Sequence, residues 1–174
     1  MKKIFSMALL ATFIATMSSQ ALAINGTVRF QGEIITNACE ISSDSEDQLV
    51  VLGKHAVSEL MTSTETTDVN FRIKLVNCPK GLSSANVRFS GETDPTNQDY
   101  LKVTSNDKTA AAKGVAIKLK DRNKQELKLH TNSINYPIVD SQAVMNFFAS
   151  YVKTQDTVTA GKANGKADFS IIYN

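Results

Sequence analysis

The side chains with the greatest chemical potential in this 174-residue chain are two cysteines, Cys39 and Cys78, and two histidines, His55 and His130. The cysteines form no CxxC pair, and the chain has only two histidines, so a zinc site is not expected. His130 follows an apolar residue near a polar segment and has no evident catalytic partner. These residues predict neither a metal centre nor a catalytic nucleophile.

Sequence motifs for catalysis or phosphate binding are missing or incomplete. The chain has no GxSxG, HExxH or GxGxxG. The stretch GKANGKA, Gly161–Ala167, resembles a phosphate-binding loop. However, it is one residue short between its glycines, and Ala167 replaces the required Ser or Thr. A glycine-containing turn into the last strand explains it better, so we expect neither enzymatic activity nor a cofactor.

The first 23 residues have the pattern of an export signal. A cationic start, Met1–Lys3, precedes an apolar run over residues 4–15, and Ala21–Ala23 supplies the small residues that a signal peptidase recognises. The alternative is a membrane anchor, but the run is short for a bilayer span of about 20 residues. Cleavage after Ala23 would leave 151 residues, enough for one domain.

Export determines what we expect of the two thiols. Extracellular and periplasmic compartments are oxidising, so a disulfide between Cys39 and Cys78 is the simplest arrangement. The 39-residue separation would remove about 4 kcal/mol of unfolded-state entropy on the chain-entropy model.

Charge gives no indication of a nucleic-acid partner. Removing Lys2 and Lys3 with the signal leaves 17 basic and 17 acidic residues. The densest basic stretch, Lys118–Lys128, begins with lysines that alternate with Ile117 and Leu119. That alternation is typical of the solvated face of a strand, and we prefer this interpretation to a nucleic-acid site.

Period-two alternation recurs along the chain, separated by turn-forming stretches, and predicts an all-β sandwich. Lys54–Met61 is compatible with a helical turn. The expected strands are Gln48–Leu52, Val69–Cys78, Asn86–Gly91, Gly114–Asp121, Met145–Val152 and Ala167–Asn174.

The two ends of the expected mature chain are also strand-like. The N-terminal stretch has no neighbouring segment that could pair with it as a hairpin. At the C-terminus, Phe169, Ile171 and Tyr173 alternate with no proline among them, which predicts an open sheet edge. The alternative is a last strand paired on both sides within the chain. The alternating N-terminal positions are Ile24, Gly26, Val28, Phe30, Gly32 and Ile34.

In this order and spacing, several segments resemble the pilin subunits of chaperone–usher fimbriae, most closely the type 1 fimbrial major subunits. At the C-terminus, Tyr173 is penultimate and Gly161 is fourteenth from the end, as in that family. The other matching segments are GTVRFQGEIITNAC (26–39), DQLVVLG (47–53), LVNC (75–78), KGVAIKLKDRNKQEL (113–127) and MNFFASYVKT (145–154).

The resemblance implies an incomplete immunoglobulin-like β-sandwich that lacks its final strand. Residues 24–36 would be an N-terminal donor-strand extension and residues 37–174 the pilin domain. A periplasmic chaperone would cover the open groove, whose edge the resemblance assigns to Gly161, Phe169, Ile171 and Tyr173. At the outer-membrane usher, the donor strand of the next subunit would replace the chaperone.

The sequence therefore favours a structural subunit that polymerises by donor-strand exchange into a surface filament used in cell adhesion. A minor or adaptor pilin, or a subunit with its own receptor-binding role, is the alternative. An exported β-sandwich hydrolase would need a catalytic constellation, and none was found. A host receptor would be reached through the assembled fibre, after export through the periplasm to the cell surface.

Overall fold

The computed structural model describes residues 26–32, 34, 38–105 and 109–174. The predicted signal peptide, residues 1–23, and Ile24 lie outside the described residues. The chain divides into two units, residues 1–34 and 35–174.

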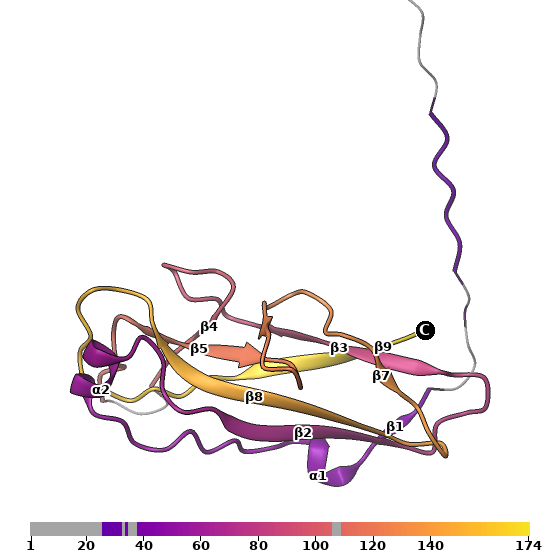
Figure 1. Ribbon diagram of the computed structural model, residues 1–174, viewed down its shortest axis with the longest axis horizontal. Helices are drawn as coiled ribbons and strands as arrows, with labels where there is room; N and C mark the ends of the chain where they lie inside the picture. The colour runs from indigo at the N-terminus through magenta and orange to yellow at the C-terminus, as the bar shows by residue number, and fades with distance from the viewer. Residues whose placement is uncertain (1–25, 33, 35–37, 106–108) are drawn as a thin grey trace, which may run out of the picture. The chain divides into compact units, whose positions relative to one another are not determined.

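In the first unit, the described residues of the expected donor strand form neither helix nor strand. Figure 1 draws them as an extended stretch. Their large apolar side chains are exposed: Val28 by 75%, Phe30 by 93% and Ile34 by 98%. The donor strand is expected to pair with another molecule, so its pairing stays a prediction. A strand exists only when a neighbour pairs with its backbone, and the described part of the chain provides none.

The second unit is a β-sandwich with two short helices, α1 (Ser43–Glu46) and α2 (Val57–Thr62). Its first sheet has the strand order β1-β2-β8-β5-β4, and β6 also pairs with β5. Every pairing is antiparallel, and the long central pair β2–β8 runs from Val69 opposite Ala149 to Leu75 opposite Ala143. The strands are β1 (Glu40–Ile41), β2 (Val69–Val76), β4 (Leu101–Lys102), β5 (Val115–Lys120), β6 (Glu126–Leu127) and β8 (Ala143–Lys153).

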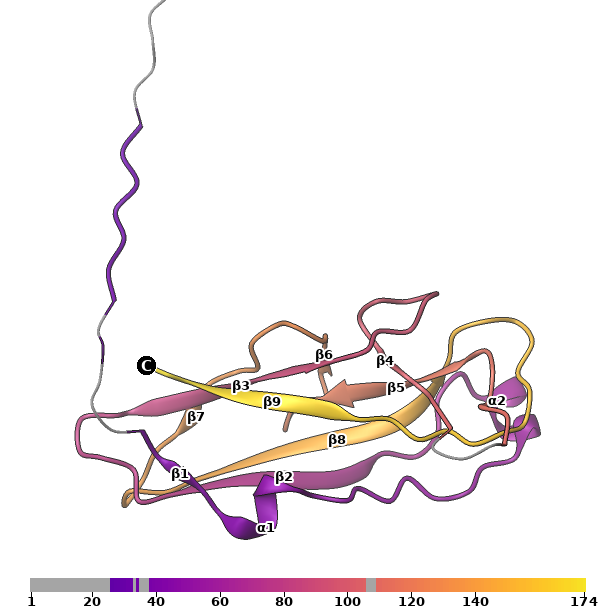
Figure 2. The same ribbon diagram turned by 180° about the vertical axis from the view of Figure 1, so that it is seen from behind.

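The second sheet contains three strands in the order β7-β3-β9. They are β7 (Tyr136–Pro137), β3 (Ser84–Gly91) and β9 (Ala167–Tyr173). The central strand β3 pairs with β9 over seven residues, from Ala85 opposite Tyr173 to Gly91 opposite Ala167. Figures 1 and 2 show this sheet packed across the first one, with β9 on the side seen in Figure 2.

The core lies between the two sheets and is built from alternate residues of their strands, as the period of two requires. Phe147 of β8 is completely buried, and its ring lies 5.1 Å from that of Phe89 on β3 in an edge-to-face arrangement. Phe71 and Tyr136 pack against the same ring. Burying one such side chain contributes about 1.5–3 kcal/mol to folding.

The lysines of β5 lie on the outer face of the first sheet, but their side chains are only 17% and 14% exposed, while Ile117 and Leu119 are buried. The Lys120 ammonium pairs with Asp68 at 2.8 Å and also with Glu65, and Lys118 pairs with Glu65 at 3.3 Å. Burial alone would raise the pKa of the Glu65 carboxyl. Hydrogen bonds from Lys120, Ser150 and Lys118 outweigh this and lower the pKa below its usual value. The start of the basic stretch is thus neutralised within the sheet.

One predicted strand is wrong. Gln48–Leu52 has no strand structure, and Leu49 and Val51 are 86% and 69% exposed. Within the described ranges, no strand pairs with this segment. The helical turn predicted within Lys54–Met61 is present as α2. No helix among the described residues is long and apolar enough to cross a bilayer.

The predicted disulfide between Cys39 and Cys78 is present, with the two Cα atoms 4.1 Å apart. It joins the residue before β1 to a residue just after β2, where Glu40 lies opposite Val76. The bond therefore holds the short strand β1 against the edge of β2. No group of three potential metal ligands occurs in the described part of the chain.

We expect the double variant Cys39→Ser/Cys78→Ser to lose about 4 kcal/mol of folding free energy, because the 39-residue loop becomes unconstrained in the unfolded chain. Urea unfolding of the purified variant and of the oxidised wild type measures this difference. The reduced wild type is the control and should unfold like the variant. Equal midpoints for the oxidised wild type and the variant would contradict the expectation.

Candidate functional site

Strand β9 pairs with β3 along one edge, and no described strand pairs with its other edge. Its inward side chains, Phe169, Ile171 and Tyr173, pack against the core but stay partly exposed. Val87, opposite Ile171 on β3, is completely buried. The core is thus covered fully beneath β3 and only partly beneath β9. Three of the four predicted groove-edge residues lie together on this strand.

Tyr173 fastens one end of the open strand. Its hydroxyl accepts a hydrogen bond from the Cys39 backbone N–H at 3.2 Å and lies 3.5 Å from the Cys39 carbonyl oxygen. Burial raises the pKa of this hydroxyl, so it stays protonated at neutral pH. The C-terminal end of β9 is therefore connected to the disulfide, although no strand lies between β9 and β1.

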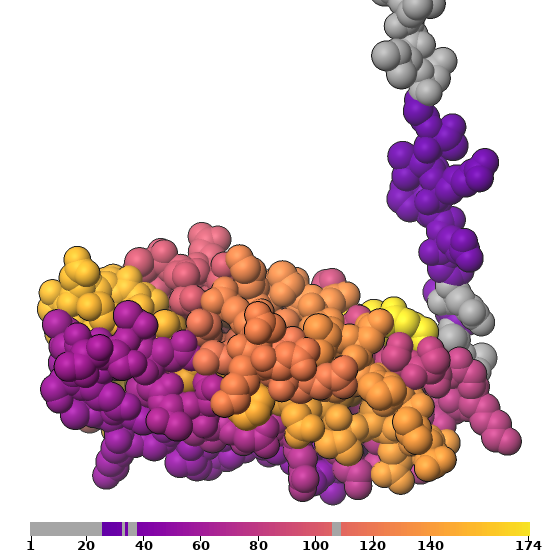
Figure 3. All heavy atoms as spheres, viewed as in Figure 1, coloured from indigo at the N-terminus to yellow at the C-terminus, as the bar shows by residue number. Residues whose placement is uncertain are grey.

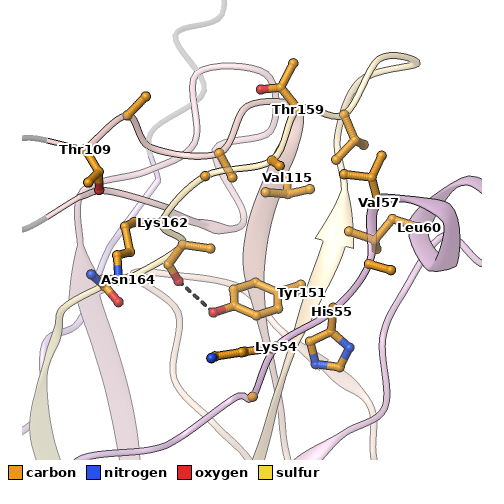
Figure 4. A pocket seen from close by; sticks show the side chains of 18 residues that line it. Lys54, His55, Val57, Leu60, Thr109, Val115, Tyr151, Thr159, Lys162 and Asn164 are labelled. Atoms are coloured by element: carbon orange, nitrogen blue, oxygen red, sulfur yellow. Dashed lines mark hydrogen bonds between the residues drawn. The ribbon is translucent and has the colours of Figure 1, made fainter.

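A cavity of about 910 Å³ lies beyond the other end of β9, in the loop region that leads into the strand. Figure 3 shows two of its walls, the α2 region in purple and the segment after β8 in golden yellow, side by side at one end of the sandwich. The Tyr151 hydroxyl donates a hydrogen bond to the Ala163 carbonyl oxygen at 2.7 Å, as Figure 4 shows. Other lining residues are Lys54, His55, Val57, Leu60, Val115, Val158 and Asn164.

Gly161, the fourth predicted edge residue, lies in the loop before β9 and lines this cavity. A Cβ at this position would lie 2.4 Å from the Ala112 nitrogen and 2.6 Å from the Ala111 carbonyl carbon. The Ala112 N–H donates to the Lys162 carbonyl at 2.8 Å, so the two backbones run in contact. Only glycine permits this approach. The structure therefore places Gly161 apart from the other three residues, at the cavity.

The sequence pattern did not indicate the cavity or its wall residues His55, Tyr151, Ala110 and Ala112. The three consecutive alanines were a usable signal, because small side chains permit another backbone to approach closely. Nothing in the local pattern indicated that Gly161 would be the partner.

Comparison with known families matches residues 28–174 to the family described as "Fimbrial protein". The chain belongs to the fimbrial protein family. It is 34% identical over 167 residues to the fimbrial subunit type 1 of Salmonella typhimurium, covering 94% of this chain and 90% of that protein. It is 35% identical over 174 residues to the probable major fimbrial subunit LpfA of Escherichia coli O157:H7, covering 99% and 96%.

Solved structures agree with the assignment. An antigen and type I fimbria protein of Burkholderia pseudomallei is 33% identical with a TM-score of 0.60, over 79% of this chain and 90% of that one. The P pilus rod subunit PapA, 22% identical with a TM-score of 0.64 over 79% and 100%, has the same fold. The predicted all-β pilin fold and the fimbrial resemblance are thus confirmed. The chain is a structural subunit of a surface fimbrium, exported through the periplasm.

Replacing Tyr173 with Phe tests the fastening of the open strand. The variant keeps the ring in the core but leaves the Cys39 N–H without its acceptor, so we expect a loss of about 1 kcal/mol at this end of β9. Hydrogen exchange of the Cys39 amide should become faster.

Tyr100→Phe is the matched control, since the Tyr100 hydroxyl donates to exposed Glu126 at 3.0 Å in the first sheet. The Cys39 amide should exchange at the wild-type rate in this variant. If Tyr173→Phe also left that rate unchanged, the proposed fastening would be wrong.

Proposed function

We propose that the open edge of β9 accepts the N-terminal segment of another copy, residues 24–36, and that subunits polymerise in this way by donor-strand exchange. The observation that carries the proposal is a match between two incomplete parts. Phe30 and Ile34 are almost fully exposed on a segment with strand alternation, whereas β9 has an open edge and a partly covered core. In this scheme residues 1–23 are the signal peptide and residues 37–174 the pilin domain.

The energetics favour pairing only if the acceptor core is completed. Burying Val28, Phe30 and Ile34 would contribute roughly 5–9 kcal/mol, at about 1.5–3 kcal/mol each. Ordering the extension costs about 1–2 kcal/mol per residue, which over residues 24–36 exceeds this gain. The balance therefore rests on the main-chain hydrogen bonds along β9 and on better coverage of Phe169 and Ile171.

Donor and acceptor parts on one chain give a heterologous contact that does not close on itself. Each added subunit presents a fresh open edge, so the product is a filament. The filament then acts in cell adhesion, and any host receptor is met by the assembled fibre. The subunit needs neither an enzymatic activity nor a cofactor for this role, and its balanced charge suits no nucleic-acid partner.

Before assembly the open edge needs temporary cover. An unpaired strand beside exposed core residues would promote aggregation in the periplasm. We propose that a periplasmic chaperone supplies a strand to β9, and that exchange for the next subunit's donor takes place at an outer-membrane usher. This is the strand-addition mode of chaperone–pilin complexes.

Phe30→Asp tests the donor role. A carboxylate cannot enter an apolar groove without a large desolvation cost, so cells that carry this variant should be without fibres in electron microscopy. Gln31→Asp, on the opposite face, is the matched control and should leave fibres intact. Cells lacking the chain give the baseline: bare cells identify a shaft subunit. Normal fibres with Phe30→Asp would contradict the proposal.

Gly32→Leu tests whether the docked donor lies close to the acceptor at this position. A Cβ on Gly32 meets no atom within 4 Å in its own chain, so the isolated subunit should be undisturbed. We expect shorter or absent fibres, with the chaperone complex recovered at the wild-type level by co-purification. Fibres of normal length would show that the groove has room at Gly32.

A further inference from the structure

His55 makes two hydrogen bonds that cannot both exist with a neutral ring. It lies in the turn that leads into α2, and its ring lines the cavity (Figure 4). Its Nδ1 lies 2.9 Å from the Glu59 Oε2 atom, and its Nε2 lies 2.9 Å from the Leu52 carbonyl oxygen. A neutral imidazole has one N–H, whereas a carboxylate and a carbonyl can only accept. Both bonds therefore require the doubly protonated ring.

The charged and titratable groups near this ring lie on α2 and the turn before it, on β8, and in the loop before β9. Glu59 on α2 is the carboxylate in contact with the ring, and Lys54 is its neighbour in the chain. From β8, the Tyr151 ring packs edge-on against it with the centroids 5.8 Å apart. Lys162 lines the same cavity from the loop before β9. The side chain of His55 is 18% exposed, whereas that of its partner Glu59 is 39% exposed, so water reaches the Glu59 end of this bond.

We propose that His55 acts as a pH-dependent clasp: when its ring is doubly protonated, its two hydrogen bonds hold the α2 wall of the cavity in place. With both nitrogens protonated, the ring ties the Leu52 carbonyl to Glu59 and closes the turn at Gly53. Loss of one proton releases one of these two partners. The α2 wall, which this change of protonation fastens or loosens, includes Ala56, Val57 and Leu60. The pH thus determines the local stability of the α2 wall of the cavity.

The direction of the pH dependence follows from the two bonds. The hydrogen bond to Glu59, and then that to Leu52, raises the pKa of His55 above its ordinary value of 6.5. Because the folded-state pKa is the higher one, the contribution is complete below pH 6.5 and is lost as the pH rises through the raised value. The clasp is therefore closed in mildly acidic solution and open in alkaline solution. This inference does not depend on donor-strand exchange.

The first test is an NMR titration of the histidine ring protons in the full chain. His130→Asn removes the other histidine and assigns the signals; His130 has a positive φ of 62°, which Asn tolerates. We expect the His55 midpoint to lie above 6.5 in wild type and in His130→Asn, and to fall in Glu59→Gln. A wild-type midpoint at or below 6.5, or one unchanged in Glu59→Gln, would overturn the proposal.

The second test measures the wall itself by hydrogen exchange of the Glu59 and Ser63 amides, which donate to Ala56 and Glu59. After correction for intrinsic exchange, we expect protection to fall about three- to tenfold between pH 6 and pH 9, the effect of losing one hydrogen bond. His55→Gln keeps a donor for Leu52 but does not titrate, so its protection should not change with pH. An equal fall in His55→Gln would refute the clasp.

Discussion

The unpaired edge of β9 is the constraint on which the rest of this structure depends. A strand with one hydrogen-bonded neighbour leaves a row of backbone groups open, and its inward side chains are covered from one flank only. Here Ile171 is partly exposed while its partner on β3, Val87, is completely buried. The sandwich therefore packs around Phe147 but still lacks part of its surface cover.

The open strand is held at both ends, which keeps its edge in position. Tyr173 joins its C-terminal end to the backbone of Cys39, and the disulfide in turn joins Cys39 to the end of β2. Before its N-terminal end, the Tyr151 hydroxyl holds the loop at Ala163. An edge fixed in this way loses little freedom when a strand is added, so less of the binding free energy is spent on ordering the acceptor.

The sequence alone predicted the strands in which the alternation of apolar residues matches the alternation of buried side chains. Alternation in β2 and β9 reflects one face on the core, and the lysines of β5 indicated which face lies away from the core. Alternation was misleading at Gln48–Leu52, because a strand also needs a partner that local sequence does not reveal. At the cavity the three alanines indicated a close backbone approach, but local sequence did not reveal its partner. The cavity depends on the contact of Gly161 with Ala112, 49 residues earlier in the chain.

The exposed N-terminal segment and the open edge of β9 carry the functional argument. A strongly apolar alternation that remains exposed, as at Phe30 and Ile34, is costly for a soluble protein unless another surface covers it. The edge strand β9 lacks what such a segment could supply, namely a strand neighbour and cover for its inward side chains. In a chain that belongs to a fimbrial family, both deficits are removed at once when the segment of one copy completes the sheet of the next. Pairing within a single subunit would remove them too, but it would leave no open edge from which a fibre could grow.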